Sequence, residues 1–136
     1  MTTTTTVAPN WTLPSLEGKT ISLTDFKGKV VLLYFDASWN NVMKEQMPIV
    51  SKIAEKNPQL QVVGIMTDKP SKLKRIKKTL QPSFPILVGD KTTPQNYGIT
   101  AFPTIVIIDQ SGRIAYSHVG LQQRSKLEEV ISAFLD

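Results

Sequence analysis

Two mainly apolar runs dominate the pattern of hydrophobic and polar residues along the chain. They cover residues 30–35, without a polar residue, and 60–66, where Gln61 is the polar residue, and neither alternates with polar residues. A strand that is apolar at nearly every position is typical of the centre of a sheet, where both faces are buried. A third run, 104–109, is followed by a turn at Gly112 and a further strand over 113–119, which predicts an antiparallel hairpin.

Helical periodicity lies between and after these strands. Apolar residues recur at helical spacing over about 41–57, 70–80 and 123–135, which predicts three amphipathic helices. Pro48 lies inside the first helix and predicts a bend there, because proline removes a backbone donor. Strands that alternate with helices predict an α/β fold with a parallel core.

Shorter elements complete the pattern. Residues 11–13 and 20–23 alternate apolar and polar side chains around a turn signal, which predicts a short hairpin. One helical turn follows this hairpin, with Thr24 or Asp25 as its N-cap. Two further short elements are predicted, a strand or extended link over 84–88 and a helix over 94–97.

The length and composition predict one domain. A chain of 136 residues, 40% of them hydrophobic, can bury a core between a sheet and its helices. We expect residues 1–9, which are polar and rich in threonine, to be flexible, and residues 10–136 to form the domain, as a monomer.

No apolar run is long enough to cross a membrane, and the amino-terminal residues lack the features of a signal peptide. As given, the chain is therefore expected in the cytoplasm. A location in the bacterial envelope remains open if the chain is a mature or truncated domain.

The positive charge is concentrated in one segment. The net charge is +5, yet residues 69–78 alone hold six positive charges and no acid, so the basic character is local. A solvated lysine face on an amphipathic helix accounts for this pattern. The alternative is an anionic partner, although no aromatic residue lies among the lysines to favour nucleic acid. The side chains available to such a partner are Lys72, Lys74, Arg75, Lys77 and Lys78.

Trp39 lies between the first apolar run and the first helical pattern. Trp39, the four residues after it and Pro48 resemble the active-site segment of the thioredoxin superfamily, in which Trp-Cys-x-x-Cys opens a helix that proline kinks a turn later. The two cysteine positions hold Asn40 and Met43, and the chain contains no cysteine at all.

Pro103, directly before the third apolar run, carries a second resemblance. In thioredoxin-like proteins a cis-proline at this place faces the Trp-Cys-x-x-Cys turn, so the resemblance implies that Pro103 is cis. The amino-terminal hairpin resembles that of TlpA-like thiol–disulfide oxidoreductases, and the peroxidatic Thr-x-x-Cys pattern of peroxiredoxins is missing. The family implies a thioredoxin-like fold, with a central mixed sheet flanked by helices, an amino-terminal β-hairpin and an inserted strand and helix.

Neither residue at the cysteine positions can perform the chemistry of this family. Dithiol–disulfide exchange needs a thiolate at the helix start and a second thiol that resolves the mixed disulfide. Asn40 has no ionisable nucleophile, although its amide oxygen is a good N-cap. The thioether of Met43 cannot form a disulfide. We therefore expect no enzyme of the family type, and no cofactor.

The non-covalent half of the family's activity can survive this loss. The resemblance implies that the backbone beside the cis-proline pairs with an extended substrate segment, which is a form of β-augmentation. The hypothesis is a protein- or peptide-binding module. One alternative is that the same residues only pack over the helix end, and another is a TlpA-like oxidoreductase from which the cysteines have been removed. The binding residues would be Trp39, Ala101, Phe102 and Pro103.

Three other groups of residues are candidates for chemistry. Asp36 and Asp68 each follow a buried strand, and burial would raise the pKa of their carboxyl groups. The amides at 40–42 could hold a small anion at the helix start. A soft copper(I) site competes with the simpler interpretation of core methionines and a surface histidine, and we expect no metal. Its ligands would be Met43, Met47, Met66 and His118.

Overall fold

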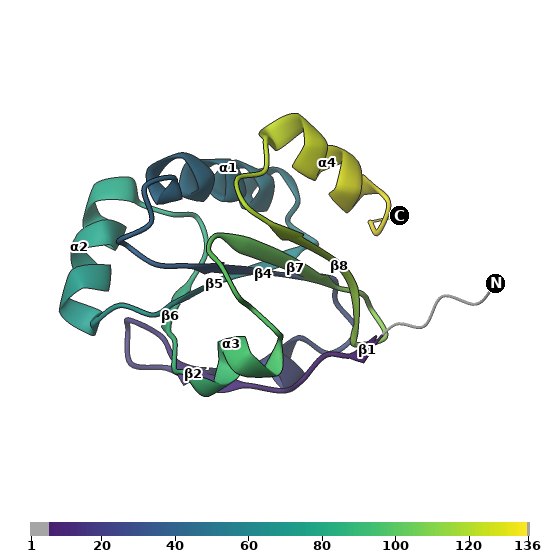
Figure 1. Cartoon of the computed structure of the whole chain (residues 1–136). Helices are drawn as coiled ribbons and strands as arrows, with labels where there is room; N and C mark the ends of the chain where they lie inside the picture. Colours follow the sequence, from purple (N-terminus) through teal and green to yellow (C-terminus); the bar gives the residue numbers. More distant parts are fainter. Residues whose placement is uncertain (1–5, 136) are drawn as a thin grey trace.

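A six-stranded mixed sheet forms the centre of the structure (Figure 1). The structure is a computed structural model that describes residues 6–135. The strand order in the sheet is β1-β8-β7-β4-β5-β6, and β2 and β3 form a separate hairpin. In chain order the elements are β1 (Thr6–Val7), β2 (Thr12–Pro14), β3 (Thr20–Ser22), the 3-10 helix η1 (Leu23–Phe26), β4 (Val31–Asp36), α1 (Met43–Lys56), β5 (Gln61–Met66), α2 (Pro70–Leu80), β6 (Ile86–Val88), α3 (Thr92–Asn96), β7 (Thr104–Ile108), β8 (Arg113–Val119) and α4 (Arg124–Ser132).

Strand β4 is central, as its continuous apolar run predicts. It pairs in parallel with β5 and antiparallel with β7, and all of its residues are buried. Alternate side chains enter different core clusters: Leu32 and Tyr34 face one side of the sheet, and Leu33 and Phe35 face the other. The mixed α/β sheet covered on both faces is therefore confirmed.

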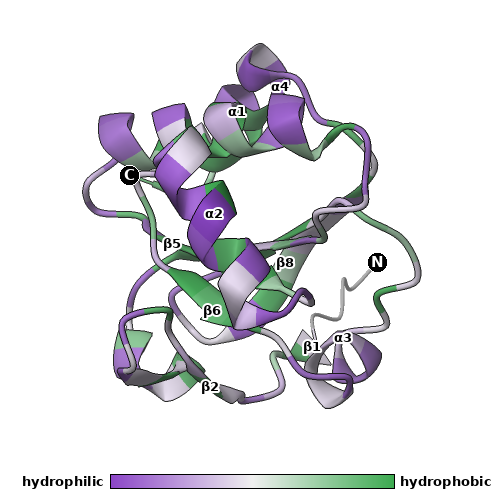
Figure 2. Cartoon of the chain, turned by 90° about the vertical axis from the view of Figure 1, so that its left-hand side faces the viewer, coloured by the Kyte–Doolittle hydropathy of each residue, from purple (hydrophilic) through white to green (hydrophobic). Residues whose placement is uncertain are grey.

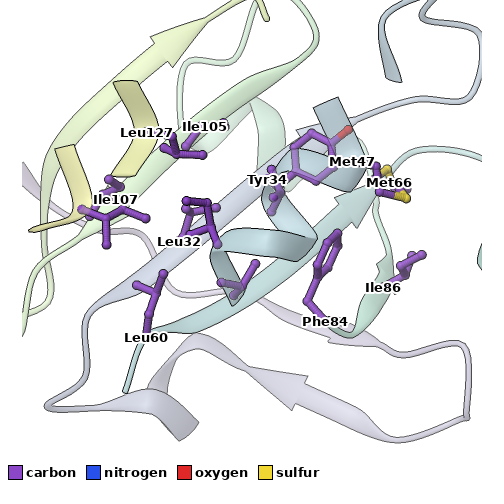
Figure 3. Packing of buried hydrophobic residues seen from close by; sticks show 14 of the residues in the cluster. Leu32, Tyr34, Met47, Leu60, Met66, Phe84, Ile86, Ile105, Ile107 and Leu127 are labelled. Atoms are coloured by element: carbon purple, nitrogen blue, oxygen red, sulfur yellow. The ribbon is translucent and has the colours of Figure 1, made fainter. Parts of the chain in front are cut away.

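Helices α1 and α4 cover one face of the sheet (Figure 1). Leu73 of α2 is fully buried in the same cluster, and Tyr34 and Phe84 meet edge to face with ring centroids 6.0 Å apart. Figure 3 shows this packing around side chains from both the sheet and the helices, among them Leu32, Met47, Met66 and Leu127.

The hairpin, η1 and α3 lie on the other face (Figure 1). Trp11 and Leu13 of the hairpin region are buried there against the sheet. Ser15 and Leu87 form an isolated bridge, so the hairpin also touches β6 at the edge of the sheet.

Two local expectations are wrong. Neither Thr24 nor Asp25 is the N-cap of η1, because Ser22 takes that position and Asp25 reaches back to accept the Ser22 backbone N–H at 2.9 Å. Asn40 does not cap α1, which begins at Met43 with no side-chain cap. The side chain of Asn40 instead donates to a buried carboxylate, which has the greater need for a donor because it is removed from water.

The expected flexible segment, residues 1–9, lies partly outside the described residues. Thr6 and Val7, which are described, form β1 and pair antiparallel with Ile114 and Arg113 of β8. In the part of the chain that the structure describes, no helix combines the length and the hydrophobicity that crossing a membrane requires.

Candidate functional site

The motif residues gather at the carboxyl end of β4. The loop that follows β4 leads into α1, and the loop that precedes β7 lies beside it because β4 and β7 are paired up to Phe35 and Thr104. The loop after β5 joins this group, because Ser38 donates to the carboxylate of Asp68 through its backbone N–H at 2.8 Å and also through its hydroxyl. Three loops therefore meet around Trp39.

Asp36, the last residue of β4, is completely buried. Its carboxylate accepts hydrogen bonds from the hydroxyl of Tyr34, from the backbone N–H of Ala37 at 2.8 Å and from the side-chain amide of Asn40 at 2.9 Å. Burial raises the pKa of the Asp36 carboxyl above its ordinary value, and these three donors offset only part of that effect. Burial and the neighbouring Asp36 also raise the pKa of the Tyr34 hydroxyl. The expected raised pKa at Asp36 is confirmed.

The two positions that hold cysteines in the family differ in exposure. Asn40 is half-buried, while Met43 is 3% exposed and packs in the core under α1. The backbone N–H of Met43 donates to the carbonyl of Asn40 at 3.1 Å. The two residues thus lie at the two ends of one closed turn before the helix.

The peptide bond between Phe102 and Pro103 is cis. The carbonyl of Pro103 accepts the backbone N–H of Gly120 at 2.8 Å, and the carbonyl of Ala101 accepts the hydroxyl of Thr104 at 2.7 Å. Within residues 6–135, neither the backbone N–H nor the carbonyl of Phe102 has a hydrogen-bond partner. A short length of backbone is therefore open for pairing beside the motif.

Trp39 and Phe102 form an aromatic pair over this backbone. Their ring centroids lie 5.7 Å apart, with the ring planes inclined at 55°. Trp39 is 68% exposed, whereas Phe102 is half-buried against the core cluster of the hairpin side. The structure thus brings Trp39 and Phe102 into contact, with Ala101 and Pro103 directly adjacent in the chain.

The protein comparisons agree with this geometry. Residues 4–117 match the model of the AhpC/TSA family. The chain belongs to that family. It is 34% identical over 127 residues to the thioredoxin-like protein YneN of Bacillus subtilis, covering 90% of this chain and 75% of that protein. It is 31% identical over 129 residues to the thiol-disulfide oxidoreductase ResA of Bacillus thuringiensis, covering 91% of this chain and 74% of that protein.

Solved structures of proteins named as thiol:disulfide interchange proteins or thioredoxins share the fold. A Chlorobium tepidum protein named as a thiol:disulfide interchange protein, DsbE, superposes with a TM-score of 0.91 at 29% identity, covering 97% of each chain. The exposed lipoprotein thioredoxin Etrx1 of Streptococcus pneumoniae superposes with a TM-score of 0.83 at 25% identity, covering 92% of this chain and 99% of that one. The thioredoxin-like fold and the resemblance to the TlpA-like group are confirmed, in a chain without cysteine.

Three of the four candidate copper ligands are core residues of this protein. Met43, Met47 and Met66 are all buried in the cluster beneath α1, and His118 lies half-buried on β8. No group of three or more histidine, aspartate or glutamate side chains that could hold a metal occurs in residues 6–135.

A pocket of about 460 Å³ lies at the opposite end of β4 from the motif. Val31, at the start of β4, and Ile108, at the end of β7, form part of its wall. It contains none of the motif residues, so the candidate site remains at the Trp39 end.

Sequence reasoning missed two parts of the site. The bond from Tyr34 to Asp36 is invisible in the sequence because alternation places the Tyr34 ring in the core, and only its hydroxyl reaches the carboxylate. Ser38 was missed because its partner, Asp68, is thirty residues away in the chain. The sequence feature that could have indicated both hydrogen bonds is the position of Asp36 and Asp68 at or just after the ends of strands.

Proposed function

We propose that this protein is a protein- or peptide-binding module that has lost the dithiol–disulfide exchange of its family. The binding face consists of Trp39, Ala101, Phe102 and Pro103. The observation that supports it is the unpaired backbone N–H and carbonyl of Phe102 next to an exposed tryptophan. An extended peptide can add its own backbone there, while the aromatic pair contacts its side chains.

The lost chemistry follows from the composition. Thiol–disulfide exchange requires a thiolate, and the chain contains no cysteine. The binding step needs none, because main-chain hydrogen bonds and aromatic contact supply the affinity.

A purely packing role for Trp39 fits its exposure poorly. A tryptophan that stabilises the fold buries most of its large apolar surface, as Trp11 does at 4% exposed. Trp39 leaves 68% of its surface in solvent, and exposed aromatic residues are typical of binding hot spots.

The test is peptide selection with a matched pair of variants. The intact chain is expected to enrich binders from a random phage-displayed dodecapeptide library. Trp39→Asp is expected to weaken those peptides by about tenfold or more, since a central tryptophan anchor carries a large share of the binding energy. Val7→Asp is the control, because Val7 is 62% exposed but lies on β1 at the far edge of the sheet. No enrichment, or equal binding by Trp39→Asp and the intact chain, would overturn the proposal.

The second candidate function is that of a TlpA-like oxidoreductase from which the cysteines have been removed. The closed turn between Asn40 and Met43 supports it, because two cysteines at those positions would be close enough to form a disulfide.

A further inference from the structure

A cleft of about 300 Å³ lies between the start of α1 and α2. Its apolar walls come from Met43, Ile76 and Leu80, and Thr79 completes its lining. Figure 2 views the molecule with α2 toward the reader and shows hydrophilic residues over much of that helix. Three cationic side chains surround the cleft: Lys44, Lys72 and Arg75.

These three cations have no ion-pair partner within residues 6–135. Lys77, on the same helix, differs because it pairs with Glu17 of the hairpin turn. The side chains of Lys44, Lys72 and Arg75 are exposed, so their positive charge faces solvent at the mouth of an apolar cleft. Such a surface complements an anion that also carries an apolar group.

The cleft and the proposed binding face are connected by short lengths of chain. Met43, in its wall, lies four residues after Trp39. Ser38 binds Asp68, which precedes α2 by two residues. One loop therefore separates the aromatic pair from the cationic cleft, and a single extended ligand can contact both.

We propose that the partner of the binding face is an acidic protein segment. One of its apolar side chains enters the cleft against Met43, Ile76 and Leu80, and its carboxylates lie beside Lys44, Lys72 and Arg75. This inference rests on the proposed function and names the chemical class of its partner.

A peptide suits these features better than other anions. The unpaired backbone at Phe102 matches the main chain of a peptide. Helix α2 carries no aromatic residue on which a nucleic-acid base could stack. The apolar walls of the cleft accept a side chain, which a phosphate backbone does not provide.

The test uses nuclear magnetic resonance on the full chain labelled with ¹⁵N. One probe is a synthetic dodecapeptide pool with four glutamates around a central leucine and random remaining positions. The other is the same pool with glutamine in place of each glutamate. We expect the acidic pool to shift the amides of Lys44 and of 72–80 together with those of Ala101, Phe102 and Thr104. The pool with glutamine is expected to bind about tenfold more weakly at low salt. This preference should shrink at high salt, because ions screen exposed charges.

A pair of double variants locates the effect. Lys72→Glu with Arg75→Glu is expected to abolish the preference for the acidic pool. Lys19→Glu with Lys27→Glu is the control, because it makes the same change in net charge at exposed lysines of the hairpin side. This control is expected to retain the preference for the acidic pool. Thermal unfolding of both double variants verifies that they fold.

The outcomes separate the two proposals. Equal shifts of the Ala101, Phe102 and Thr104 amides with both pools, without shifts in α2, would overturn the acidic partner and leave the binding face standing. Shifts confined to the cleft would overturn the binding face and, with it, the acidic partner of that face, and so would the absence of shifts with either pool. Tighter binding of a twelve-nucleotide oligo(dT) or of phosphatidylglycerol vesicles than of the acidic pool would overturn the peptide in favour of a general polyanion surface.

Discussion

Asp36 is the residue whose environment departs furthest from that of an ordinary surface acid. It is completely buried, and all three of its hydrogen-bond donors come from residues within four positions in the chain. The network connects the core, through the ring of Tyr34, to the start of the candidate site at Asn40. A buried carboxylate of this kind rigidifies the loop when every lone pair is used.

The raised pKa of Asp36 predicts a specific dependence of stability on pH. The folded protein holds the Asp36 proton more tightly than the unfolded chain, in which the carboxyl has its ordinary pKa of 3.8. This contribution is therefore fully present below that pH and is lost as the pH rises through the folded pKa. Asp36→Asn removes this dependence, because asparagine does not titrate. Between the unfolded and the folded pKa of Asp36, the free energy of unfolding of the variant, measured in urea, is therefore expected to rise relative to that of the parent by at most about 1.4 kcal/mol per pH unit.

When the variant and the parent are compared at the same pH, the contributions of the other carboxyl groups to the free energy of unfolding cancel. Hydrogen bonds lower the pKa values of Glu55 and Asp90, with help from Lys52 at Glu55. At Asp109, burial raises the pKa, but hydrogen bonds and the charge of Arg113 outweigh it and lower the pKa overall. These three carboxyl groups contribute the opposite slope in both proteins. A difference in unfolding free energy that stays constant from pH 3.5 to 7 would show that Asp36 does not carry the effect.

Restoring two cysteines tests how far the site has diverged. Asn40→Cys with Met43→Cys is expected to form an intramolecular disulfide under mild oxidation and to reduce insulin in the presence of dithiothreitol. The closed turn holds the two positions within about 7 Å, and the amides at the start of α1 stabilise a thiolate there. Mass spectrometry with and without alkylation detects the disulfide. A double variant that folds but forms no disulfide would refute this view of the turn.

At the scale of elements, α1 is tied to the segment before α4 by a reciprocal pair of hydrogen bonds. The backbone N–H of Gln122 donates to Oε1 of Gln46 at 2.7 Å, and Nε2 of Gln46 donates to the carbonyl of Gln122 at 3.2 Å. The Gln46 side chain thus substitutes for a peptide group. Both residues are buried, so no water can replace these bonds at low cost.

Gln46→Ala is expected to lower the free energy of unfolding by about 2–4 kcal/mol, because it leaves two buried backbone groups of Gln122 unpaired and opens a cavity. Urea unfolding measures the change. Lys52→Ala on the same helix is the control, since its pairing with Glu55 is exposed and its loss should go undetected. Equal costs for the two variants would mean that the hydrogen bonds of Gln46 contribute nothing.

Element boundaries were predicted best where local chemistry fixes them. The basic helix spans residues 70–80 as expected, because proline is favoured at a first helical position and Gln81 ends the helix in the left-handed region, at a φ of 47°. The start of α1 was predicted two residues early. There the side chain of Asn40 hydrogen-bonds to Asp36 and does not cap the helix. The periodicity of the sequence does not predict this hydrogen bond.

At the scale of the whole molecule, the sheet separates two unlike layers. One face carries the long helices α1 and α4, and the other carries the short hairpin, η1 and α3. The motif loop, the cis-proline loop and the cationic cleft all lie toward the carboxyl end of β4. The proposed binding functions therefore share one end of the molecule, held by a sheet whose central strand is buried throughout.

The sequence by itself determined the order of the strands and helices, the central position of β4 and the absence of cysteine. Each of these follows from local periodicity or from residue identity, which folding does not change. Only the tertiary structure decided that Trp39 contacts Phe102, that Asp36 takes the amide of Asn40, and that α2 and α1 enclose a cationic cleft. These contacts join residues through loops whose paths depend on packing, because every buried polar group must find its partner wherever the folded chain provides one.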